Sequence, residues 1–499
     1  MQNDKAKKTN LWRWQDLKSG FDAEATLYPA AGAELPVELD ALNKGDTFIQ
    51  RVVVDSRLAA RGDLFIALPG DPGSRFNPSY VSQVDGHDFV GAALANGAVA
   101  AIVARGVPVA LPQIIVSDTY DALWHLAGIA RKRLKNPVCA ITGSSGKTTA
   151  KHFLTAALSA YSPPGSFNNH IGVPLALANA RPEAPAFVFE IGTSGPGEIR
   201  PLANMVNADL AILLNVHNAH IENFSGRDAL IEEKSQIFAP FETTINQVKD
   251  EREGNAGIKV VEASLGLPGF TFGEFAGADA RILEVLGDRL ALTLFGEKLQ
   301  ARIPGGGAHR ANTLAAVILA TKLLDQDLSP ALNLDDSVLP TGRGNVIGHG
   351  GVTVVDDSYN ANSASMRAAI KAFCQRDSLR KIAVLGEMLE LGDESASAHK
   401  NLLTQLGGFD VVFLVGSAMM HLAASEGLFD EQAVAFAADQ GLGLRHNNLH
   451  FYPEASGILL KDLTALIHPE DALLIKGSNR VFWARDFVSK LLKAIAEKL

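Results

Sequence analysis

Along most of the chain, short apolar runs alternate with segments of helical periodicity, which is the pattern of a parallel α/β sheet. In the middle of the chain this pattern predicts buried strands over Pro137–Thr142, Pro185–Gly192 and Asp209–Val216, and helices over Thr148–Ala160 and Ala311–Leu324. We therefore expect parallel strands joined by crossover helices in this region.

The two ends of the chain show related patterns. Near the start, Ile49–Val54 and Asp63–Ala67 predict strands and Phe89–Asn96 predicts a helix, while Ile245–Gly307 predicts a strand-rich excursion from the central pattern. A further alternating set predicts strands over Val352–Asp356, Lys381–Leu385, Val411–Val415, Leu449–Tyr452 and Ala472–Ile475. A turn residue and helical periodicity follow each of these, which indicates a second doubly wound unit.

The composition is that of an ordinary globular protein, with 47% hydrophobic and 20% charged residues. A net charge of −10 argues against nucleic-acid binding, so any anionic ligand must be held by local groups. Cys139 and Cys374 lie among apolar residues, and we expect buried, inert thiols. The N-terminus has no apolar signal core and polar residues interrupt the apolar stretch Gly91–Val116, so we expect a cytoplasmic protein without a membrane span.

The strongest chemical signal is the string VCAITGSSGKTT at Val138–Thr149, between a predicted strand and a predicted helix. Glycines let backbone N–H groups curl around a phosphate, the helix N-terminus adds positive potential, and lysine and threonine side chains reach phosphate and Mg²⁺. Two residues separate the glycines where the general phosphate loop has four, which specifies a subgroup. A plain glycine turn is the alternative. We expect a phosphate group to contact Gly143, Ser144, Ser145, Gly146, Lys147, Thr148 and Thr149.

At 499 residues, the chain is about three times a common domain size. We expect an α/β protein of three domains. They are a small α/β domain over residues 1–111, a central parallel sheet of the phosphate-loop ATPase type over 112–328, and a Rossmann-like domain over 329–499.

Polar residues near the ends of predicted central elements are candidates for binding a cation or a substrate. Glu190 closes one strand, where a carboxylate beside a phosphate loop is placed to hold Mg²⁺ directly or through water. His217 and His220 follow the next strand, without the spacing of a strong zinc motif. Asn168 and Asn169 precede a helix, where they either bind a carboxylate or peptide, or cap the helix.

The last third of the chain carries weaker signals. Arg343 precedes a strand, and an acid at the end of that strand, such as Asp357, suits a ribose hydroxyl, while the arginine suits a phosphate or carboxylate. For both residues, a role in loop structure is the alternative. Lys476 ends the last strand as a possible anion contact. Lys234 lies in the central string IEEKSQIF, and the pattern alone predicts that it belongs to the solvated face of a helix.

Taken in order, these strings resemble the ATP-dependent Mur ligases of peptidoglycan synthesis over nearly the whole chain. The shared strings are DSR at Asp55–Arg57, GDLFIAL at Gly62–Leu68, DGHDF at Asp85–Phe89, TGSSGKTT, NNHIGVP, EIGTSGPGEI, AHIENF, EKSQIF, Gly342-Arg343, DDSYNAN and KGS. NNHIGVP with DDSYNAN favours the branch that joins D-alanyl-D-alanine to UDP-N-acetylmuramoyl-tripeptide. The resemblance implies a cytoplasmic, monomeric enzyme of cell-wall synthesis, cell shape and cell division that uses ATP and Mg²⁺ and forms an acyl phosphate.

The resemblance also implies roles for single residues. The implied substrate contacts are Ser56, Arg57 and His87 at the UDP end and Asn168, Asn169, Ser194, Asn360 and Lys476 elsewhere. The implied nucleotide contacts beyond the phosphate loop are Asn312, Arg343 and Asp357, and the implied metal contacts are Thr148, Glu190 and His220. Lys234 falls where the family carries a carbamylated lysine that helps to organise Mg²⁺, and it completes a catalytic set with Lys147 and His220.

Three features depart from the family pattern. His309 stands where the family has an adenine-side asparagine, and Gly192-Thr193-Ser194-Gly195 stands where it commonly has Gly-Ala-Asn-His. The loop before Asp85 is also longer than usual. We expect these contacts and the N-terminal geometry to differ accordingly.

Two other interpretations stay open: an amide ligase with a different acceptor, and a nucleotide-binding switch or scaffold without ligase turnover. A dinucleotide-dependent hydride transfer is remote, because no G-x-G-x-x-G follows the first strand of the central unit.

Overall fold

The computed structural model describes residues 11–21, 25–27, 48–73, 76, 81–217, 223–241, 257–376, 378–389 and 391–498. The chain folds into two compact units, which are described separately. The first comprises residues 1–142, 159–211 and 233–257, and the second comprises residues 143–158, 212–232 and 258–499. Among the described residues, no helix combines the length and apolarity that crossing a membrane requires.

The first unit begins with a five-stranded sheet in the order β2-β7-β6-β5-β4, in which only β2 is antiparallel to its neighbour. Its strands are β2 (Ala25–Leu27), β4 (Arg51–Val53), β5 (Asp63–Ile66), β6 (Ala100–Val103) and β7 (Pro112–Ile115), and a separate ribbon pairs β1 (Trp12–Arg13) with β3 (Phe48–Ile49). The accompanying helices are α1 (Trp14–Gly20), α3 (Val90–Ala95) and α4 (Thr119–Arg133), with short 3-10 turns at η1 (Ser56–Leu58) and η2 (Gly86–Phe89). The early strands and helix are therefore confirmed.

The same unit also contains β8, β9 and the first half of β10, up to Ala211, which pair in the order β10-β8-β9. These are β8 (Val138–Thr142), β9 (Phe187–Glu190) and β10 (Leu210–Leu213), and every residue in them is buried. Full burial explains their nearly continuous apolar sequences, because strands covered on both faces do not alternate apolar and polar residues. The helices nearby in the chain are α6 (Gly172–Ala178), α7 (Ile199–Val206) and α8 (Arg227–Ser235), which continues into η4 (Gln236–Phe238).

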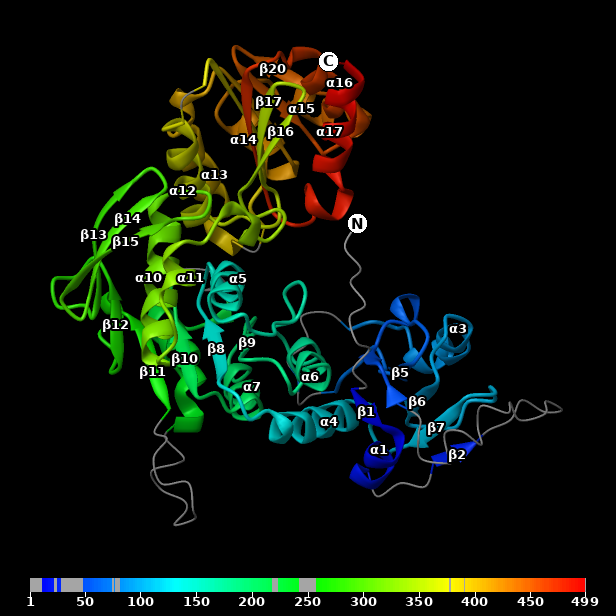
Figure 1. The fold of residues 1–499 in the computed structure, drawn as a ribbon. Coiled ribbons are helices and arrows are strands. Elements are labelled where there is room, and N and C mark those ends of the chain that lie inside the picture. Colours follow the sequence, from blue (N-terminus) through cyan, green and yellow to red (C-terminus); the bar gives the residue numbers. More distant parts are fainter. Residues whose placement is uncertain are drawn as a thin grey trace. The chain divides into compact units, whose positions relative to one another are not determined.

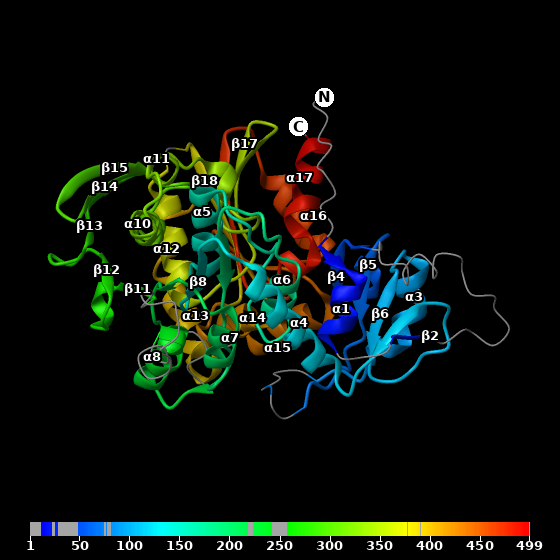
Figure 2. The ribbon, with the colours of Figure 1, turned by 60° about the horizontal axis from the view of Figure 1, so that its bottom comes forward.

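The second unit contains the predicted strand-rich excursion, which is confirmed over residues 257–307. Its strands follow the order β11-β12-β13-β14-β15, with parallel pairing up to β13 and an antiparallel meander beyond it. They are β11 (Ile258–Glu262), β12 (Phe270–Gly273), β13 (Ala280–Leu286), β14 (Arg289–Leu294) and β15 (Glu297–Arg302). The long helix α10 (Ala308–Leu323) packs beside them and against α5 (Lys147–Leu158), as Figure 1 and Figure 2 show. The short elements η5 (Ala263–Leu265), α11 (Ser329–Leu332) and η6 (Asp336–Val338) complete this part.

A seven-stranded sheet follows in the order β16-β17-β22-β18-β19-β21-β20, parallel except for its two edge strands. Its strands are β16 (Asn345–His349), β17 (Val352–Asp357), β18 (Arg380–Gly386), β19 (Val411–Val415), β20 (Leu444–His446), β21 (Leu449–Tyr452) and β22 (Asp471–Lys476). Its helices are α12 (Ser363–Cys374), α13 (Ser395–Leu403), α14 (Ser417–Ser425), α15 (Glu431–Gln440), α16 (Gly457–Leu466) and α17 (Phe487–Lys498), with 3-10 turns η7 (Gly392–Glu394), η8 (Leu406–Gly408) and η9 (Trp483–Arg485). All five strands predicted here are confirmed.

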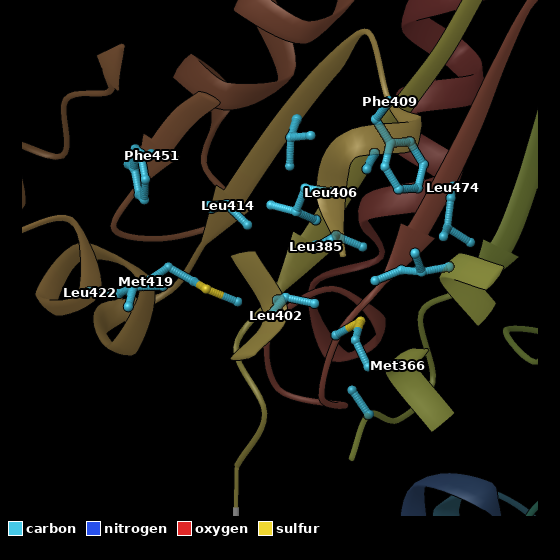
Figure 3. Close-up of a cluster of buried hydrophobic side chains, with 14 of the residues drawn as sticks. Met366, Leu385, Leu402, Leu406, Phe409, Leu414, Met419, Leu422, Phe451 and Leu474 are labelled. Atoms are coloured by element: carbon cyan, nitrogen blue, oxygen red, sulfur yellow. The ribbon is translucent and has the colours of Figure 1, made fainter. Parts of the chain in front are cut away.

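Two apolar clusters pack this sheet against its helices. Figure 3 shows one of them, in which Leu385 and Leu414 from the sheet lie among Met366 from α12, Leu402 from α13 and Met419 from α14. The other cluster joins sheet residues to α16 and α17. Helices on both faces of a mainly parallel sheet define the predicted Rossmann-like architecture.

The α/β fold class is thus confirmed, while the domain boundaries at residues 111–112 and 328–329 stay predictions. Cys139 is fully buried and its pKa is raised by burial, as expected of an inert thiol. Cys374 is only partly buried.

Candidate active site

The phosphate-loop string forms the predicted turn between strand β8 and helix α5. Gly143 and Gly146 take φ values of +157° and +79°, which side chains disfavour. A Cβ at Gly143 would lie 3.0 Å from Leu214 Cβ, and one at Gly146 would lie 3.2 Å from Thr313 Oγ1. The loop therefore needs glycine for its conformation and for space, and it leads directly into the N-terminus of α5, where anions are stabilised.

Asn215 braces this loop from the residues that follow β10, and sequence reasoning did not assign it a role. Its Oδ1 accepts hydrogen bonds from Ser145 N (3.0 Å) and Oγ (3.4 Å), its Nδ2 donates to Ser145 O (3.1 Å), and its own carbonyl accepts from Ser144 N (3.1 Å). The Ser144 hydroxyl also exchanges hydrogen bonds with the His217 backbone. An asparagine just after a buried strand is the only signal that the sequence offered.

Lys147 and Thr148 open the helix that follows the loop. Lys147 Nζ donates to Gly143 O at 2.7 Å, so the ammonium lies back over the loop. Thr148 is buried in the first turn, as is Thr149. This arrangement concentrates positive potential where a phosphate would sit.

Helix α10 contributes to the same unit beside the loop. Asn312 Oδ1 is buried and has no hydrogen-bond partner among the described residues, which suits a group that contacts a ligand. His309 is exposed at the start of α10. Desolvation lowers the pKa of its imidazole, and the positive charges of Arg310 and Lys476 lower it further. The imidazole is therefore neutral at pH 7.

The predicted residues of the last third come together through two buried cations. The Arg310 guanidinium donates to the carbonyls of Gly305, Gly306 and Arg343, at 3.0, 3.0 and 3.1 Å. Beyond it, the Arg343 guanidinium carbon lies 4.2 Å from the centre of the Tyr359 ring, in cation–π geometry.

The second of these cations is Lys476, at the end of β22. Its Nζ donates to Asp357 Oδ2 at 2.8 Å and to Asn360 O at 3.0 Å. The side-chain oxygen of Asn360 accepts from its neighbour Ala361 N at 2.9 Å. Lys476 therefore joins the ends of β22 and β17, where Asp357 and Asn360 were predicted to act.

In the first unit, Glu190 ends β9 with a fully buried carboxylate. Its Oε1 accepts from Asn168 Nδ2 at 3.2 Å, and its Oε2 has no hydrogen-bond partner among the described residues. A buried, unpaired carboxylate oxygen is costly, so the residue fits a cation ligand. No group of three or more metal-binding side chains forms within the described part of the chain. His220 lies outside it.

The neighbouring polar residues have distinct surroundings. Asn169 Oδ1 accepts from Ile171 N and Gly172 N at 3.2 and 2.8 Å, which caps α6, one of the two roles predicted for it. Ser194 N donates to Glu198 Oε2 at 2.7 Å. Lys234 is buried on α8, so its side chain does not lie on the solvated face that the pattern alone favoured.

At the N-terminal sheet, Arg57 is exposed and pairs with Asp55 through two short hydrogen bonds of 2.9 and 2.7 Å. Ser56 is buried, and its carbonyl accepts from Asn96 Nδ2 at 2.8 Å. His87 is buried with Nε2 accepting from Ala104 N at 2.8 Å, which directs the Nδ1 proton to Asp85 Oδ1 at 2.6 Å. Both ring nitrogens of His87 are thus occupied within the protein.

Phosphate loop, α/β sheets and strand-end carboxylates together define a nucleotide-binding α/β enzyme. The sequence matches the Mur ligase middle domain over residues 141–320 and the Mur ligase, glutamate ligase domain over residues 342–479. The chain belongs to the Mur ligase family, as its resemblance predicted.

Curated relatives of this chain carry the name UDP-N-acetylmuramoyl-tripeptide–D-alanyl-D-alanine ligase. The protein of Rickettsia prowazekii is 31% identical over 73% of this chain and 82% of its own length. The protein of Escherichia coli K12 is 30% identical over 78% of this chain and 86% of its own length.

Solved structures agree with this placement. MurF from Acinetobacter baumannii superposes with a TM-score of 0.74 at 27% identity, covering 97% of this chain and all of that one. MurF from Thermotoga maritima in complex with ADP gives a TM-score of 0.68 at 26% identity, covering 90% of this chain and 98% of that one.

Proposed function

We propose that this chain is an ATP-dependent ligase that joins D-alanyl-D-alanine to UDP-N-acetylmuramoyl-tripeptide and releases ADP and phosphate. The carrying observation is the braced phosphate loop, with Lys147 over it and α5 behind it, in a chain whose family members bear that activity in their names. The product would be the pentapeptide precursor of peptidoglycan.

The reaction begins with a tripeptide carboxylate, which is a poor electrophile. Its oxygen attacks the γ-phosphorus of ATP, and the bond from that phosphorus to the β-γ bridging oxygen breaks. ADP departs, and the tripeptide carboxylate has become an acyl phosphate. The amine of D-alanyl-D-alanine then attacks the acyl carbon, loses a proton, and expels phosphate from the tetrahedral intermediate. Lys147 and the α5 N-terminus offset the repulsion between carboxylate and triphosphate.

Glu190 and Thr148 are two described residues that would hold Mg²⁺, because Glu190 offers an unpaired carboxylate oxygen and Thr148 a hydroxyl in the first turn of α5. When bound, Mg²⁺ neutralises charge on the phosphates. His220 is the third proposed ligand, and a carbamate on the buried Lys234 is the fourth.

The remaining assignments follow the same proposal. Asn312, Arg343 and Asp357 contact the nucleotide, and Ser56, Arg57 and His87 serve the UDP end. The proposal includes a cytoplasmic location and, because the product is a precursor of peptidoglycan, a role in cell shape and division. We propose a monomer that binds no nucleic acid, in keeping with the net charge of −10.

The deciding experiment measures phosphate release from ATP and Mg²⁺ with UDP-N-acetylmuramoyl-tripeptide, with and without D-alanyl-D-alanine. We expect release only with both substrates and the pentapeptide product by mass spectrometry. Phosphate release that does not depend on the dipeptide would indicate another acceptor. Nucleotide binding without phosphate release would indicate a switch.

Two variants test the catalytic assignments in that assay. Lys147→Ala should lower kcat by about a thousandfold, as loss of a group that stabilises phosphoryl transfer does, while Lys298→Ala on exposed β15 serves as the control. Lys234→Ala should abolish turnover; full activity in either site variant contradicts its assignment.

A further inference from the structure

Glu233 precedes Lys234 on α8 and is itself buried, with 7% of its surface exposed. Its Oε2 accepts from Gly197 N at 2.8 Å and its Oε1 accepts from Ile199 N at 2.9 Å. Both carboxylate oxygens therefore bind backbone N–H groups of one segment. We call these two hydrogen bonds the Glu233 clamp.

The clamp supplies what α7 lacks at its own start. The residue that precedes the helix, Glu198, makes no capping hydrogen bond to it, because its Oε2 accepts from Ser194 N instead. The first N–H groups of a helix have no partners within it and favour a negative charge. Glu233 meets both requirements at Ile199 N, the first N–H group of α7, and its second hydrogen bond holds Gly197 N just before the helix. The contact therefore fixes the end of α8 to the start of α7.

A second side-chain pair joins the same two segments as the clamp. Gln236 Oε1 accepts from Arg200 Nε at 2.6 Å, three residues beyond Glu233 on the one side and one residue beyond Ile199 on the other. The two contacts flank Lys234 in the chain. On the α7 side, the contacts are made at Gly197, Ile199 and Arg200. The segment that leads to them begins at Glu190 and includes Ser194, in the string that departs from the family pattern.

We propose that Glu233 is a positioning residue for the ligase reaction, which holds the turn bearing Lys234 in register with the Glu190–Ser194 segment. The inference rests on the proposed function, in which Lys234 acts as a carbamate and Glu190 as a metal ligand. Glu233 touches neither substrate nor nucleotide in this role. Without the clamp, Lys234 and Glu190 lose their fixed relation, while the phosphate loop keeps its own bracing from Asn215.

The test compares Glu233→Ala and Glu233→Gln with the parent, using Glu232→Gln on the exposed side of the same turn as the control. Glutamine keeps one acceptor oxygen but turns an NH₂ group toward the other N–H, so it breaks half of the clamp. We expect kcat to fall about tenfold in Glu233→Gln and more in Glu233→Ala, with KM for ATP within about twofold of the parent.

A second readout follows the lysine itself. In ¹³C-bicarbonate, the parent should give a carbamate carbon signal that Lys234→Ala removes, and both Glu233 variants should need several-fold more bicarbonate to reach half of that signal. Glu233→Asp, whose shorter carboxylate still accepts hydrogen bonds, should recover part of it and replaces Glu233→Ala if that variant does not fold.

Unchanged kcat and bicarbonate dependence in Glu233→Gln would overturn the inference. So would a fall in kcat that matches a rise in KM for ATP and a lower melting temperature, because that pattern indicates a structural role only. Failure of the proposed function itself is recognised separately, since the parent would then show no acceptor-dependent phosphate release.

Discussion

Asp85, His87 and Ala104 form a short chain of hydrogen bonds beside the first sheet. Ala104 N donates to the His87 ring, and Asp85 accepts from both the ring and the backbone of His87 and from Arg105. Partial burial pushes the pKa of Asp85 upward, but these hydrogen bonds outweigh it and lower the pKa to about 2. A histidine predicted to contact substrate is thus held by groups of the protein itself.

The lowered pKa of Asp85 makes this network sensitive to acid. Because the folded-state pKa lies below the ordinary value near 3.8, its stabilisation is complete above pH 4 and is lost as pH falls through about 2. Asp85→Asn should lower the free energy of unfolding at pH 6 by ~1 kcal/mol or less, since the carboxylate is partly exposed. The difference from the parent should shrink between pH 4 and pH 2.

Urea unfolding followed at pH 6 and pH 2.5 checks this dependence. Asp71→Asn is the control, because the hydrogen bond that its carboxylate accepts from Gly73 N is local. An equal deficit of Asp85→Asn at both pH values would show that its charge is not what stabilises the network.

At the scale of elements, the start of α10 is joined to the segment before β16 by one buried side chain. Arg310 reaches the carbonyl of Arg343, and Gly344 packs so closely that an added Cβ would lie 1.8 Å from Arg310 Nη2. Gly344 also has φ of +87°, which a side chain disfavours. A predicted nucleotide contact therefore depends on a glycine that follows it.

Gly344→Ala should destabilise this junction, because Arg310 must leave at least one of its three carbonyl partners and the backbone must change. We expect a loss of ~3 kcal/mol in unfolding free energy and a higher KM for ATP. Gly348→Ala on β16 is the matched control, since its added Cβ meets nothing within 4 Å. Equal melting temperatures for the two variants would refute the argument.

Elements with continuous apolar sequences could be predicted to within a few residues, as β8, β19 and β22 illustrate. The edge strands β16 and β20 were missed, because polar residues such as Asn345 and Arg445 give an edge strand no apolar signature. These strands form because they pair with a neighbouring strand, and the local sequence carries no signal of that pairing.

The same division applies to the site. The phosphate loop was predictable because glycine, lysine and threonine act within one turn of chain. The supports from Asn215 and Glu233 were not, since each joins segments 34 to 70 residues apart. The environment of Lys234 shows the same limit, because its sequence pattern predicted solvent and its fold buries it.

At the scale of the whole molecule, the nucleotide and UDP assignments fall in different compact units. The phosphate loop, Asn312, Arg343 and Asp357 lie in the second unit, whereas Ser56, Arg57 and His87 lie in the first. Each ligand should therefore leave its own pattern of protection against hydrogen–deuterium exchange, because binding slows the local opening of the segments that it contacts.

With Mg²⁺ and ADP, exchange should slow several-fold in residues 143–158 and 308–323 and stay unchanged in residues 51–66 and 86–103. UDP-N-acetylmuramoyl-tripeptide should slow exchange in those N-terminal segments instead. Lys147→Ala should weaken the ADP pattern and leave the UDP pattern intact, which separates lost binding from general instability. Protection of the N-terminal segments by ADP alone would contradict the assignments, because the residues proposed to bind the nucleotide all belong to the second unit.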